Sequence, residues 1–374
     1  MDMRIRPHAL AGTLIPPPSK SMQHRCIIAE LLAEGRTEIV PASEDAERTK
    51  AAMLQLLHGA SEPVDCGSSG TTLRFLLPLA AVLAPCAEFT GTPRLLARPL
   101  GEALAYVRTE RGLRLSGEKL PERIILSAER SSQDLSGLLF ALPLLPGEHS
   151  IILRGECVSR PYIAMTLAVL RGYGIRIDET EWGFRVPGRQ HYVNQKTLLP
   201  ERDWSHAAFF LAAKALGMPL EVEGLRRPSL QGDAAVETLL ADLPDTVALA
   251  DTPDLLPPLA LYAALREGKH TVFTSLAHLR GKESDRIESV AAALAALGAG
   301  AESGEDTLTV RGVKEFCGGR VNAMGDHRIA MLAALAAPFS TGEILLHGAE
   351  TVKKSYPGFW NEYRRVGGEA EEVR

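Results

Sequence analysis

The sequence contains few cysteines, and they do not form a pattern. Cys26, Cys66, Cys86, Cys157 and Cys317 are irregularly spaced, and no two of them form a CxxC pair. A zinc knuckle and a disulfide framework both need regular cysteine pairs, so neither is indicated. We expect Cys26 and Cys86 to be small core residues because their neighbours are apolar. The sequence therefore predicts no metal site.

The chain also lacks an excess of positive charge and a long apolar run. Its formal net charge is -5 at pH 7 over 374 residues, which gives no support to nucleic-acid binding. The first seven residues contain no apolar segment of a signal peptide. The longest apolar stretch, residues 75–87, contains two prolines and is too short to span a bilayer. We therefore expect a cytoplasmic protein that binds neither nucleic acid nor a membrane.

The sequence does contain a repeated unit. A small polar or charged cluster precedes a strongly apolar helix, a turn and a strand, and a more amphipathic helix often follows. Six such openings occur, at residues 19–21, 67–72, 131–133, 203–205, near 254 and at 326–328. In the first copy we expect helices over 26–35 and 46–59 and a strand at 37–40. The chain length and the repeats predict an α/β fold with two similar domains of three units each.

The leading helix of each unit is apolar nearly all round, for example over residues 73–84 and 329–339. This pattern predicts helices that are buried on every side. The Ser, Thr and Asp residues at the openings are favourable helix N-caps. If the buried helices run parallel, their N-termini point to one end of each domain and suit a polyanionic ligand. Any single opening is more often only a helix cap.

Cationic side chains accompany these openings. Arg74, Arg98 and Arg328 have apolar neighbours, and arginine suits bidentate contacts with phosphate and carboxylate groups. Residues 67–72 resemble a phosphate-binding loop but lack the lysine of a Walker A motif, and no GxGxxG follows the first strand. Nucleoside triphosphate and dinucleotide binding are therefore not indicated, and we expect no cofactor.

Titratable residues cluster in the second half of the chain. The candidates for proton transfer are Asp254, Glu283, Asp285, Asp326 and His327. Glu283 lies between Lys282 and Arg286, so it is either an acid with a perturbed pKa or part of a structural ion pair. His327 is either an oriented acid or base, or a histidine at a helix cap.

Eight short segments occur in the same order as in a known family. They are residues 19–25 (SKSMQHR), 67–74 (GSSGTTLR), 90–99 (TGTPRLLARP), 131–133, 159–162, 282–286, 326–328 and 354–357. Each alone is weak evidence, but eight in order are specific. The chain therefore resembles the 5-enolpyruvylshikimate-3-phosphate synthase family of enolpyruvyl transferases over nearly its whole length.

The resemblance implies two domains of about three βαβαββ-type units each. Buried parallel helices would be surrounded by sheets, with the active site in the interdomain cleft. The family chain crosses between its domains twice, so the first domain would combine residues 1–18 and 201–374. The second domain would contain residues 19–200. The resemblance also implies a monomer that needs no cofactor and no metal.

The resemblance further implies transfer of the enolpyruvyl group of phosphoenolpyruvate to the 5-hydroxyl of shikimate 3-phosphate, with release of phosphate. The catalytic residues would be Lys20, Asp254, Glu283 and His327. Shikimate 3-phosphate would contact Ser21, Arg25, Ser131, Ser132, Gln133, Ser159, Tyr162, Asp254 and Lys282. Phosphoenolpyruvate would contact Lys20, Gly70, Arg98, Gln133, Arg286, Arg328 and Lys354.

Some positions depart from the family pattern. Pro18 replaces a usual glycine, Ser68 replaces a common asparagine, and His278 stands where some members have an asparagine that contacts the shikimate phosphate. The chain is also short for the family, so we expect some units to lack loops or strands.

Two alternative functions would share some of these sequence features. The first is the sibling transferase that acts on UDP-N-acetylglucosamine, but the segment between Arg94 and Arg98 lacks that family's loop cysteine. The second is a non-catalytic module that binds anions or nucleic acid. It would explain the basic residues but not the presence of Asp254 and Glu283 together.

Overall fold

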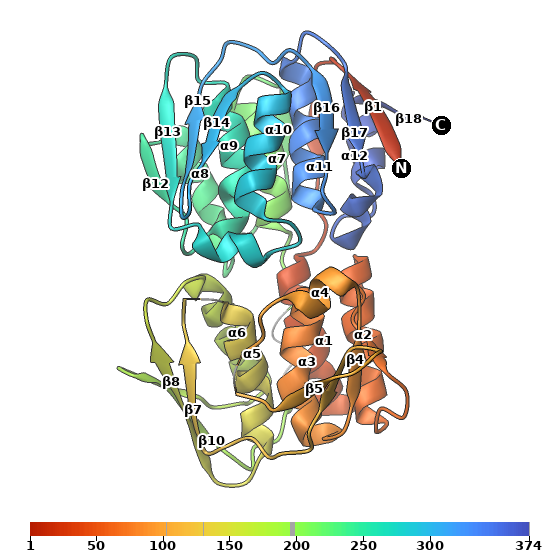
Figure 1. Ribbon diagram of the computed structural model, residues 1–374, viewed down its shortest axis with the longest axis vertical. Helices are drawn as coiled ribbons and strands as arrows, with labels where there is room; N and C mark the ends of the chain where they lie inside the picture. Colours follow the sequence, from red (N-terminus) through yellow and green to blue (C-terminus); the bar gives the residue numbers. More distant parts are fainter. Residues whose placement is uncertain (102, 130, 195–198, 374) are drawn as a thin grey trace. The chain divides into compact units, whose positions relative to one another are not determined.

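The computed structural model describes residues 1–101, 103–129, 131–194 and 199–373. The chain divides into two compact units, of which unit 1 contains residues 1–18 and 201–374 and unit 2 contains residues 19–200. Both combine helices with small mixed sheets, so the prediction of an α/β fold is confirmed (Figure 1). In the described ranges, no helix has both the length and the apolar character needed to cross a membrane.

Unit 2 begins with two helices and continues with alternating strands and helices. Its helices are α1 (Lys20–Glu34), α2 (Glu44–Leu57), α3 (Gly70–Leu83), α4 (Pro93–Ala97), α5 (Ser132–Ala141), η1 (Leu142–Leu144) and α6 (Arg160–Gly172). Its strands are β3 (Val64–Asp65), β4 (Glu88–Thr90), β5 (Tyr106–Arg108), β6 (Leu113–Leu115), β7 (Arg123–Ser127), β8 (Glu148–Arg154), β9 (Asp178–Thr180) and β10 (Gly183–Pro187).

Unit 1 contains both ends of the described chain. Its helices are α7 (Trp204–Ala215), η2 (Gly232–Ala235), α8 (Val236–Ala241), η3 (Pro253–Leu255), α9 (Leu256–Ala264), η4 (Ala277–Gly281), α10 (Arg286–Ala296), α11 (His327–Ala336), η5 (Ala337–Phe339), η6 (Ala349–Lys354) and α12 (Phe359–Arg365). Its strands are β1 (Asp2–Arg6), β2 (Gly12–Leu14), β11 (Leu220–Val222), β12 (Thr246–Ala248), β13 (His270–Thr274), β14 (Gly300–Ser303), β15 (Leu308–Arg311), β16 (Gly319–Asn322), β17 (Ile344–His347) and β18 (Glu369–Val373).

Within the described residues, four sheets share one topology. Their strand orders are β3-β4-β6-β5, β7-β8-β10-β9, β12-β13-β15-β14 and β16-β17-β1-β18. In each sheet the first two strands pair parallel and the other pairs are antiparallel. The helix between the two parallel strands is α3, α5, α9 or α11. In the fourth sheet the third strand is β1, which comes from the N-terminal end of the sequence.

Two of the six expected repeats differ from these four. Among the described residues, the repeat that contains α7 has the two-stranded parallel sheet β2-β11. Residues 36–41 have no regular secondary structure, so the predicted strand at 37–40 is wrong. Side chains of α1 and α2 bind this backbone instead. Gln23 Nε2 donates to the carbonyl of Val40 (3.0 Å), and Lys50 Nζ donates to the carbonyl of Ile39 (3.5 Å).

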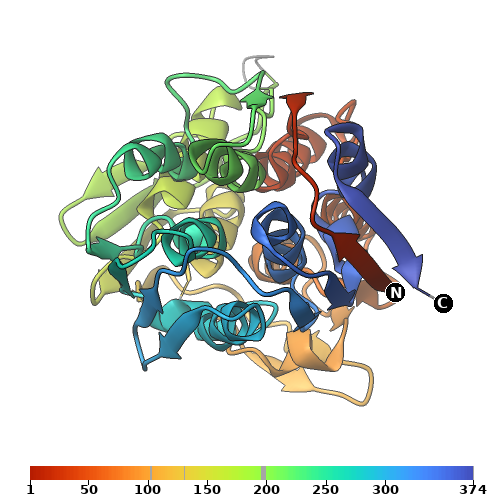
Figure 2. The same cartoon turned by 90° about the horizontal axis from the view of Figure 1, so that it is seen from above.

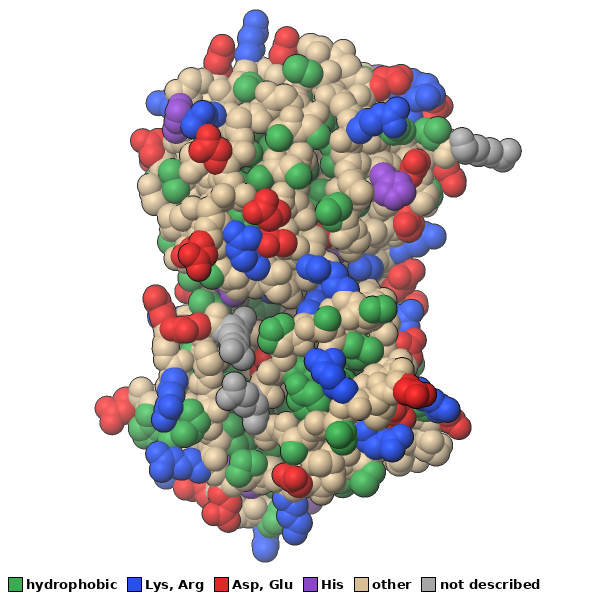
Figure 3. All heavy atoms as spheres, in the orientation of Figure 1, with side chains coloured by type: hydrophobic (Ala, Val, Ile, Leu, Met, Phe, Trp, Pro, Cys, Tyr) green, Lys and Arg blue, Asp and Glu red, His purple; other side chains and the backbone are tan. Residues whose placement is uncertain are grey.

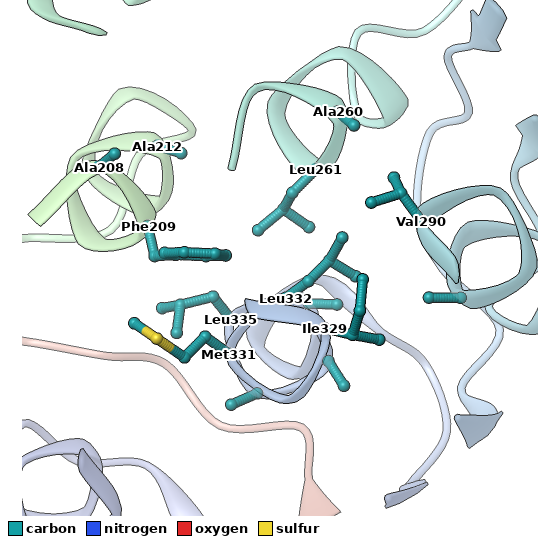
Figure 4. Packing of buried hydrophobic residues seen from close by; sticks show 14 of the residues in the cluster. Ala208, Phe209, Ala212, Ala260, Leu261, Val290, Ile329, Met331, Leu332 and Leu335 are labelled. Carbon is teal, nitrogen blue, oxygen red and sulfur yellow. The ribbon is translucent and has the colours of Figure 1, made fainter. Parts of the chain in front are cut away.

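The leading helices are buried as their composition predicts. Every residue of α11 is buried, and most of α3 is. In unit 1, α7, α9, α10 and α11 pack against one another, and Figure 2 shows them nearly end-on. Figure 4 shows side chains from three of these helices, Phe209, Leu261, Leu332 and Leu335, pointing toward one another.

The expectation that Cys26 and Cys86 are core residues is right for one of them. Cys26 is buried in α1, where burial raises the pKa of its thiol to about 12. Cys86 is exposed because it follows α3 at a turn next to Pro85, beyond the last buried turn of the helix. Apolar neighbours in sequence therefore do not ensure burial at a helix end.

Most of the polar openings are helix caps, as expected. Ser69, Asp203 and Asp326 accept hydrogen bonds from backbone N–H groups in the first turns of α3, α7 and α11. Ser19 and Ser159 precede α1 and α6 and make no such cap bond. Their hydroxyls are therefore not used to stabilise the helix ends.

Candidate active site

The predicted residues of unit 1 come together around Arg286, the first residue of α10. This side chain is 1% exposed. Its Nη1 lies 2.7 Å from Asp254 Oδ1, its Nη2 lies 2.6 Å from Glu283 Oε2, and its Nε lies 3.0 Å from Asp326 Oδ2. Burial alone would lower the pKa of Arg286, but these carboxylates outweigh it and raise the pKa above its ordinary value.

Asp254 bridges two guanidinium groups. Its Oδ1 accepts from Arg286 and its Oδ2 lies 2.7 Å from Arg328 Nη2. Burial alone would raise the pKa of Asp254, but Arg328, Arg286 and Lys282 hold it well below its ordinary value. Asp254 is therefore an anion at neutral pH, and in this paired state it is a weak base.

Lys282 and His278 lie on the turn that leads into α10. Burial, and after it the charge of Lys282, lowers the pKa of His278 to about 4. Its imidazole is therefore neutral at pH 7. A neutral imidazole can take part in hydrogen bonds without adding charge.

Asp326, His327 and Arg328 form the N-terminus of α11. Asp326 caps the helix through the backbone N–H of Arg328 (3.0 Å) and also accepts from the Ser284 hydroxyl (3.2 Å). His327 is buried, with a ring nitrogen 3.8 Å from Asp326 Oδ1. Lys354 Nζ donates to the carbonyl of Gly325 at 2.9 Å, directly before this segment. The first turns of α10 and α11 and the end of η6 thus carry one cluster of charged groups.

In unit 2, Lys20 begins α1 and is held by Asp45 of α2. The Lys20 Nζ and Asp45 Oδ2 atoms are 2.9 Å apart, and both side chains are largely buried. Asp45 was not predicted from the sequence as a site residue. It is one of three acidic residues in the first turn of α2, and nothing in the local pattern distinguishes it.

A second cluster of unit 2 lies at the N-termini of α3 and α5. Gln133 Nε2 donates to Thr71 Oγ1 (2.8 Å), and Gln133 Oε1 accepts from Arg74 Nη1 (3.2 Å). A Cβ atom on Gly70 would lie 2.8 Å from Arg98 Nη1 and 3.0 Å from Arg74 Nη1. The absence of a side chain at Gly70 therefore lets two guanidinium groups approach the first turn of α3, where free N–H groups already favour an anion.

The remaining predicted residues of unit 2 lie around α6. Arg25 donates from Nε to Thr166 Oγ1 (2.7 Å), from Nη1 to the Ser21 carbonyl (2.7 Å) and from Nη2 to the Tyr162 carbonyl (2.9 Å). Arg25 thus joins α1 to α6. The other residues predicted here lie at helix starts: Ser131 caps α5, Ser132 is its first residue, and Ser159 precedes α6.

Ser159 has a left-handed backbone, with φ 58° and ψ 37°. This conformation is uncommon for a residue with a side chain and is found at functional sites when the surroundings enforce it. Ser159 is buried, and its carbonyl accepts from the Tyr162 N–H at 3.0 Å.

Asp233 is a second residue that sequence reasoning missed. It is buried on η2 and accepts a hydrogen bond from the Ser205 hydroxyl in the first turn of α7. Burial, and next the charge of Asp254, raises the pKa of Asp233 to about 7. It follows Gly232 in a segment that carries no recognisable motif, and only folding brings it near Asp254.

The described residues contain no group of three or more His, Cys, Asp or Glu side chains arranged to hold a metal ion. On the face shown in Figure 3, acidic and basic side chains are interspersed. The concentration of positive groups is thus local, at the helix N-termini.

Comparison with solved structures defines the class of protein. EPSP synthase from Acinetobacter baumannii superposes with a TM-score of 0.75 at 25% identity, covering 99% of this chain and 100% of that one. The enolpyruvyl transferase NikO from Streptomyces tendae has a TM-score of 0.70 at 16% identity, covering 99% and 98% of the two chains, and shows likeness of fold alone. The fold is that of the enolpyruvyl transferases.

Sequence comparison narrows the class to one family. The family model for EPSP synthase (3-phosphoshikimate 1-carboxyvinyltransferase) matches residues 5–248 and 243–363. The 3-phosphoshikimate 1-carboxyvinyltransferase of Clostridium kluyveri is 35% identical over 98% of this chain and 98% of its own length. That of Brachyspira hyodysenteriae is 32% identical over 98% and 99%. This chain belongs to the EPSP synthase family.

Proposed function

We propose that this chain catalyses the 3-phosphoshikimate 1-carboxyvinyltransferase reaction of the shikimate pathway, which leads to chorismate and the aromatic amino acids. The enolpyruvyl group of phosphoenolpyruvate is transferred to the 5-hydroxyl of shikimate 3-phosphate, and phosphate is released. The observation that carries this proposal is the full-length similarity to enzymes of that name. The clusters of guanidinium, ammonium and carboxylate groups supply the chemistry that the reaction needs.

We further propose that units 1 and 2 act as the two domains of the enzyme and that both contribute to one site in the cleft between them. In this proposal each domain has about three repeats of the βαβαββ type. One repeat of unit 1 has a two-stranded sheet, and the first repeat of unit 2 has no strand at residues 36–41. The proposal is supported by the helix N-termini, which carry the predicted residues in both units. Several N-termini directed at one ligand suit a pair of small polyanions.

Phosphoenolpyruvate carries a carboxylate and a phosphate. In the proposed site, Arg286, Arg328 and Lys354 of unit 1 and Lys20 and Arg98 of unit 2 neutralise these groups, and Gln133 and the Gly70 backbone donate hydrogen bonds. The short N···O distances of Arg286 and Arg328 to Asp254 support this role, because they place two guanidinium groups side by side.

Shikimate 3-phosphate offers a phosphate, a carboxylate and hydroxyls. The serines at the starts of α1, α5 and α6 provide hydroxyls and free N–H groups for the phosphate. In the proposed mode these are Ser21, Ser131, Ser132 and Ser159, together with Arg25, Gln133 and Tyr162. Asp254 and Lys282 of unit 1 then bind the ring hydroxyls. The unusual backbone of Ser159 supports a functional role for the start of α6.

The reaction is addition followed by elimination. The 5-hydroxyl oxygen bonds to C2 of phosphoenolpyruvate while C3 gains a proton and becomes a methyl group. The C2–O bond to phosphate then breaks, C3 loses a proton, and the phosphate departs. We assign the acid at C3 to Glu283, with His327 as its alternative, and the base at the hydroxyl to Asp254 assisted by Lys20.

The ion pairs of Asp254 imply an order of events. Asp254 is a weak base while Arg286 and Arg328 hold it, because they depress its pKa. The carboxylate and phosphate of phosphoenolpyruvate compete for the same guanidinium groups. As these turn toward the ligand, the pKa of Asp254 rises, so the base becomes effective only when both substrates are bound.

Phosphate release tests the proposal. The protein is incubated with phosphoenolpyruvate and either shikimate 3-phosphate or UDP-N-acetylglucosamine, without added metal or cofactor, and inorganic phosphate is measured over time. We expect release only with shikimate 3-phosphate. Release only with the nucleotide sugar would replace the proposed acceptor, and release with neither would refute the proposed function. Light scattering on the same sample tests the proposal that the enzyme is a monomer.

A further inference from the structure

A buried contact joins α7 to the segment that carries Lys354. His206, in the first turn of α7, is 1% exposed, and so is Ser355. The His206 Nε2 and Ser355 Oγ atoms are 3.0 Å apart and share a hydrogen bond, whose donor depends on the tautomer of the ring. The other ring nitrogen, Nδ1, lies 3.3 Å from Asp203 Oδ1. The contact therefore joins parts of the chain that are 149 residues apart.

Ser355 lies at the end of η6. Lys354 is the last residue of η6 and Ser355 follows it, with its N–H donating to the Val352 carbonyl at 3.1 Å. Lys354 Nζ reaches the Gly325 carbonyl at 2.9 Å. The backbone of Lys354 is thus held next to a tethered serine, and its ammonium group lies at the loop that leads into α11.

The ring of His206 also packs against both of these segments. Its centroid is 5.3 Å from that of Tyr356 and 6.2 Å from that of His327. Tyr356 follows Ser355, and His327 is the first residue of α11. One buried imidazole therefore contacts the two segments of unit 1 that carry Lys354 and Arg328.

We propose that His206 is a positioning residue: by binding Ser355, it places the ammonium group of Lys354 for the anionic groups of phosphoenolpyruvate. This inference rests on the proposed function, in which Lys354 binds that substrate. His206 acts through Ser355, because it shares a hydrogen bond with that serine and Ser355 directly follows Lys354 in the chain. The interaction of an ammonium with an anion weakens as their separation grows, so a small displacement of Lys354 reduces affinity.

Two single variants remove the same hydrogen bond from opposite sides. His206→Phe keeps an aromatic ring for Tyr356 and His327 to pack against, and Ser355→Ala leaves the imidazole in place. In each variant we expect the KM for phosphoenolpyruvate to rise about fivefold, the effect of one buried hydrogen bond. The KM for shikimate 3-phosphate and kcat should change by less than about twofold, because the lost interaction serves one substrate.

Ser340→Ala is the matched control. The Ser340 hydroxyl is buried in the same unit and donates to the Ala336 carbonyl at 3.0 Å, at the C-terminal end of α11. Its removal also costs one buried serine hydrogen bond, so the loss in thermal stability should be similar. The KM for phosphoenolpyruvate should stay at the wild-type value.

Two combinations separate positioning from general loosening of the fold. The double variant His206→Phe/Ser355→Ala should show the same rise in KM as either single variant, because both remove one shared bond. In a Lys354→Met background, Ser355→Ala should cause no further rise. A further fivefold rise in that background would show that the bond does not act through Lys354.

The outcomes distinguish this inference from the proposed function. If the wild-type protein is active and both single variants keep the wild-type KM for phosphoenolpyruvate, the positioning role is refuted. Equal losses for both substrates would also refute it, as a structural effect. If His206→Phe does not fold, Ser355→Ala carries the test. If the wild-type protein releases no phosphate, the proposed function fails, and calorimetric titration of phosphoenolpyruvate into wild-type and Ser355→Ala protein still tests the inference.

Discussion

Two buried arginines, one in each unit, are held in opposite ways. Arg286 of unit 1 is bound by three carboxylates, which raise its pKa. Arg25 of unit 2 is 2% exposed and is bound by a hydroxyl and two carbonyls, and its guanidinium carbon lies 5.0 Å from the ring centre of Phe75. Burial lowers the pKa of Arg25 to about 10. The same side chain is thus stabilised by charge in one unit and by neutral groups in the other.

This difference shows how each unit can prepare for an anion. In unit 1 the guanidinium groups are already neutralised by carboxylates, so a ligand exchanges one set of negative charges for another. Around Arg25 of unit 2, neutral hydroxyl and carbonyl groups hold the cation, and helix N-termini of that unit add free N–H groups. We therefore expect changes in the carboxylate cluster around Arg286 to affect the chemical step and the balance of charge. Changes in unit 2 should affect ligand affinity.

The largest expected effect is the loss of the proposed acid of unit 1. Glu283→Gln keeps the shape of the side chain and can still accept from Arg286, but it removes the negative charge and the transferable proton. We expect kcat to fall by at least about 100-fold, as for removal of a general acid. Both KM values should change by less than about threefold, because the residue acts mainly in the transition state.

Glu288→Gln is the control for this variant. Glu288 lies in the first turn of α10, shortly after Glu283 in the sequence, and is exposed, and it accepts from the Ser303 hydroxyl at 2.8 Å. Its kinetics should match those of the wild type. Normal turnover in Glu283→Gln would remove Glu283 from the acid role and leave His327 as the candidate.

The second effect concerns stability and compares the two arginines directly. Arg286→Met removes the cation that three carboxylates share, which should lower the free energy of unfolding by about 3–5 kcal/mol. Arg25→Met leaves only neutral acceptors unsatisfied, which should cost about 1–3 kcal/mol. Urea unfolding of the two variants at pH 7 measures both. Equal losses would mean that the two arginines are stabilised in the same way.

The free energy of unfolding at acidic pH gives a second comparison, between the wild type and Arg286→Met. The folded pKa of Asp254 is depressed, so its ion pairs stabilise the fold above about pH 4, the ordinary pKa of an aspartate. This stability is lost as the pH falls further, toward the folded pKa. Arg286→Met removes one of these ion pairs, so its stability should decline less on acidification than that of the wild type.

The third effect tests affinity in unit 2. Asp45→Asn removes the charged partner of Lys20 and keeps a similar shape. We expect the kcat/KM for phosphoenolpyruvate to fall about tenfold, since the loss of a charge-assisted hydrogen bond of 1.5–3 kcal/mol leaves the ammonium less well placed. Glu44→Gln, at the preceding position of α2 and exposed, is the control. An unchanged kcat/KM in Asp45→Asn would exclude a role for this pair in the site.

The smallest effect concerns two buried histidines, one in each unit. The pKa of His278 is lowered to about 4 by burial and by Lys282, and burial together with Lys20 and Arg25 holds that of His24 well below its ordinary value. The unfolded chain therefore binds protons between about pH 6.5 and 4 that the folded chain does not. Stability should fall as the pH is lowered through this range.

Replacing these histidines should flatten the profile. His278→Asn and His24→Asn should each reduce the slope of unfolding free energy against pH between about 6.5 and 4, where an unperturbed histidine would begin to titrate. Thermal unfolding scans at several pH values measure this slope. A slope that remains unchanged in His278→Asn would contradict the lowered pKa.

The features that follow from local sequence were predictable. Polar openings before apolar helices indicated α3 and α11 and the α/β repeats. Helix capping and the burial of an apolar helix both depend on residues that are close in sequence. A strand depends on a partner that may be distant, and the expected strand at 37–40 has none among the described residues. Its backbone is bound by Gln23 and Lys50 instead.

The candidate site was predictable where motifs carried it. The segment from Lys282 to Arg286 and the Asp326-His327-Arg328 triplet pointed to the cluster of unit 1. The partners of these residues were not predictable, because they come from distant elements. Asp45, Asp233 and Ser355 lie in unremarkable local sequence, and only the fold brings them next to Lys20, Ser205 and His206.

The central claim is that positive groups of both units bind the same two substrates. A crystal structure of the Glu283→Gln variant with shikimate 3-phosphate and phosphoenolpyruvate tests it most directly. We predict that the carboxylate and phosphate of phosphoenolpyruvate are contacted by Lys20 and Arg98 of unit 2 and by Arg286 and Lys354 of unit 1. Substrates held by residues of one unit alone, with the other cluster facing solvent, would contradict the account.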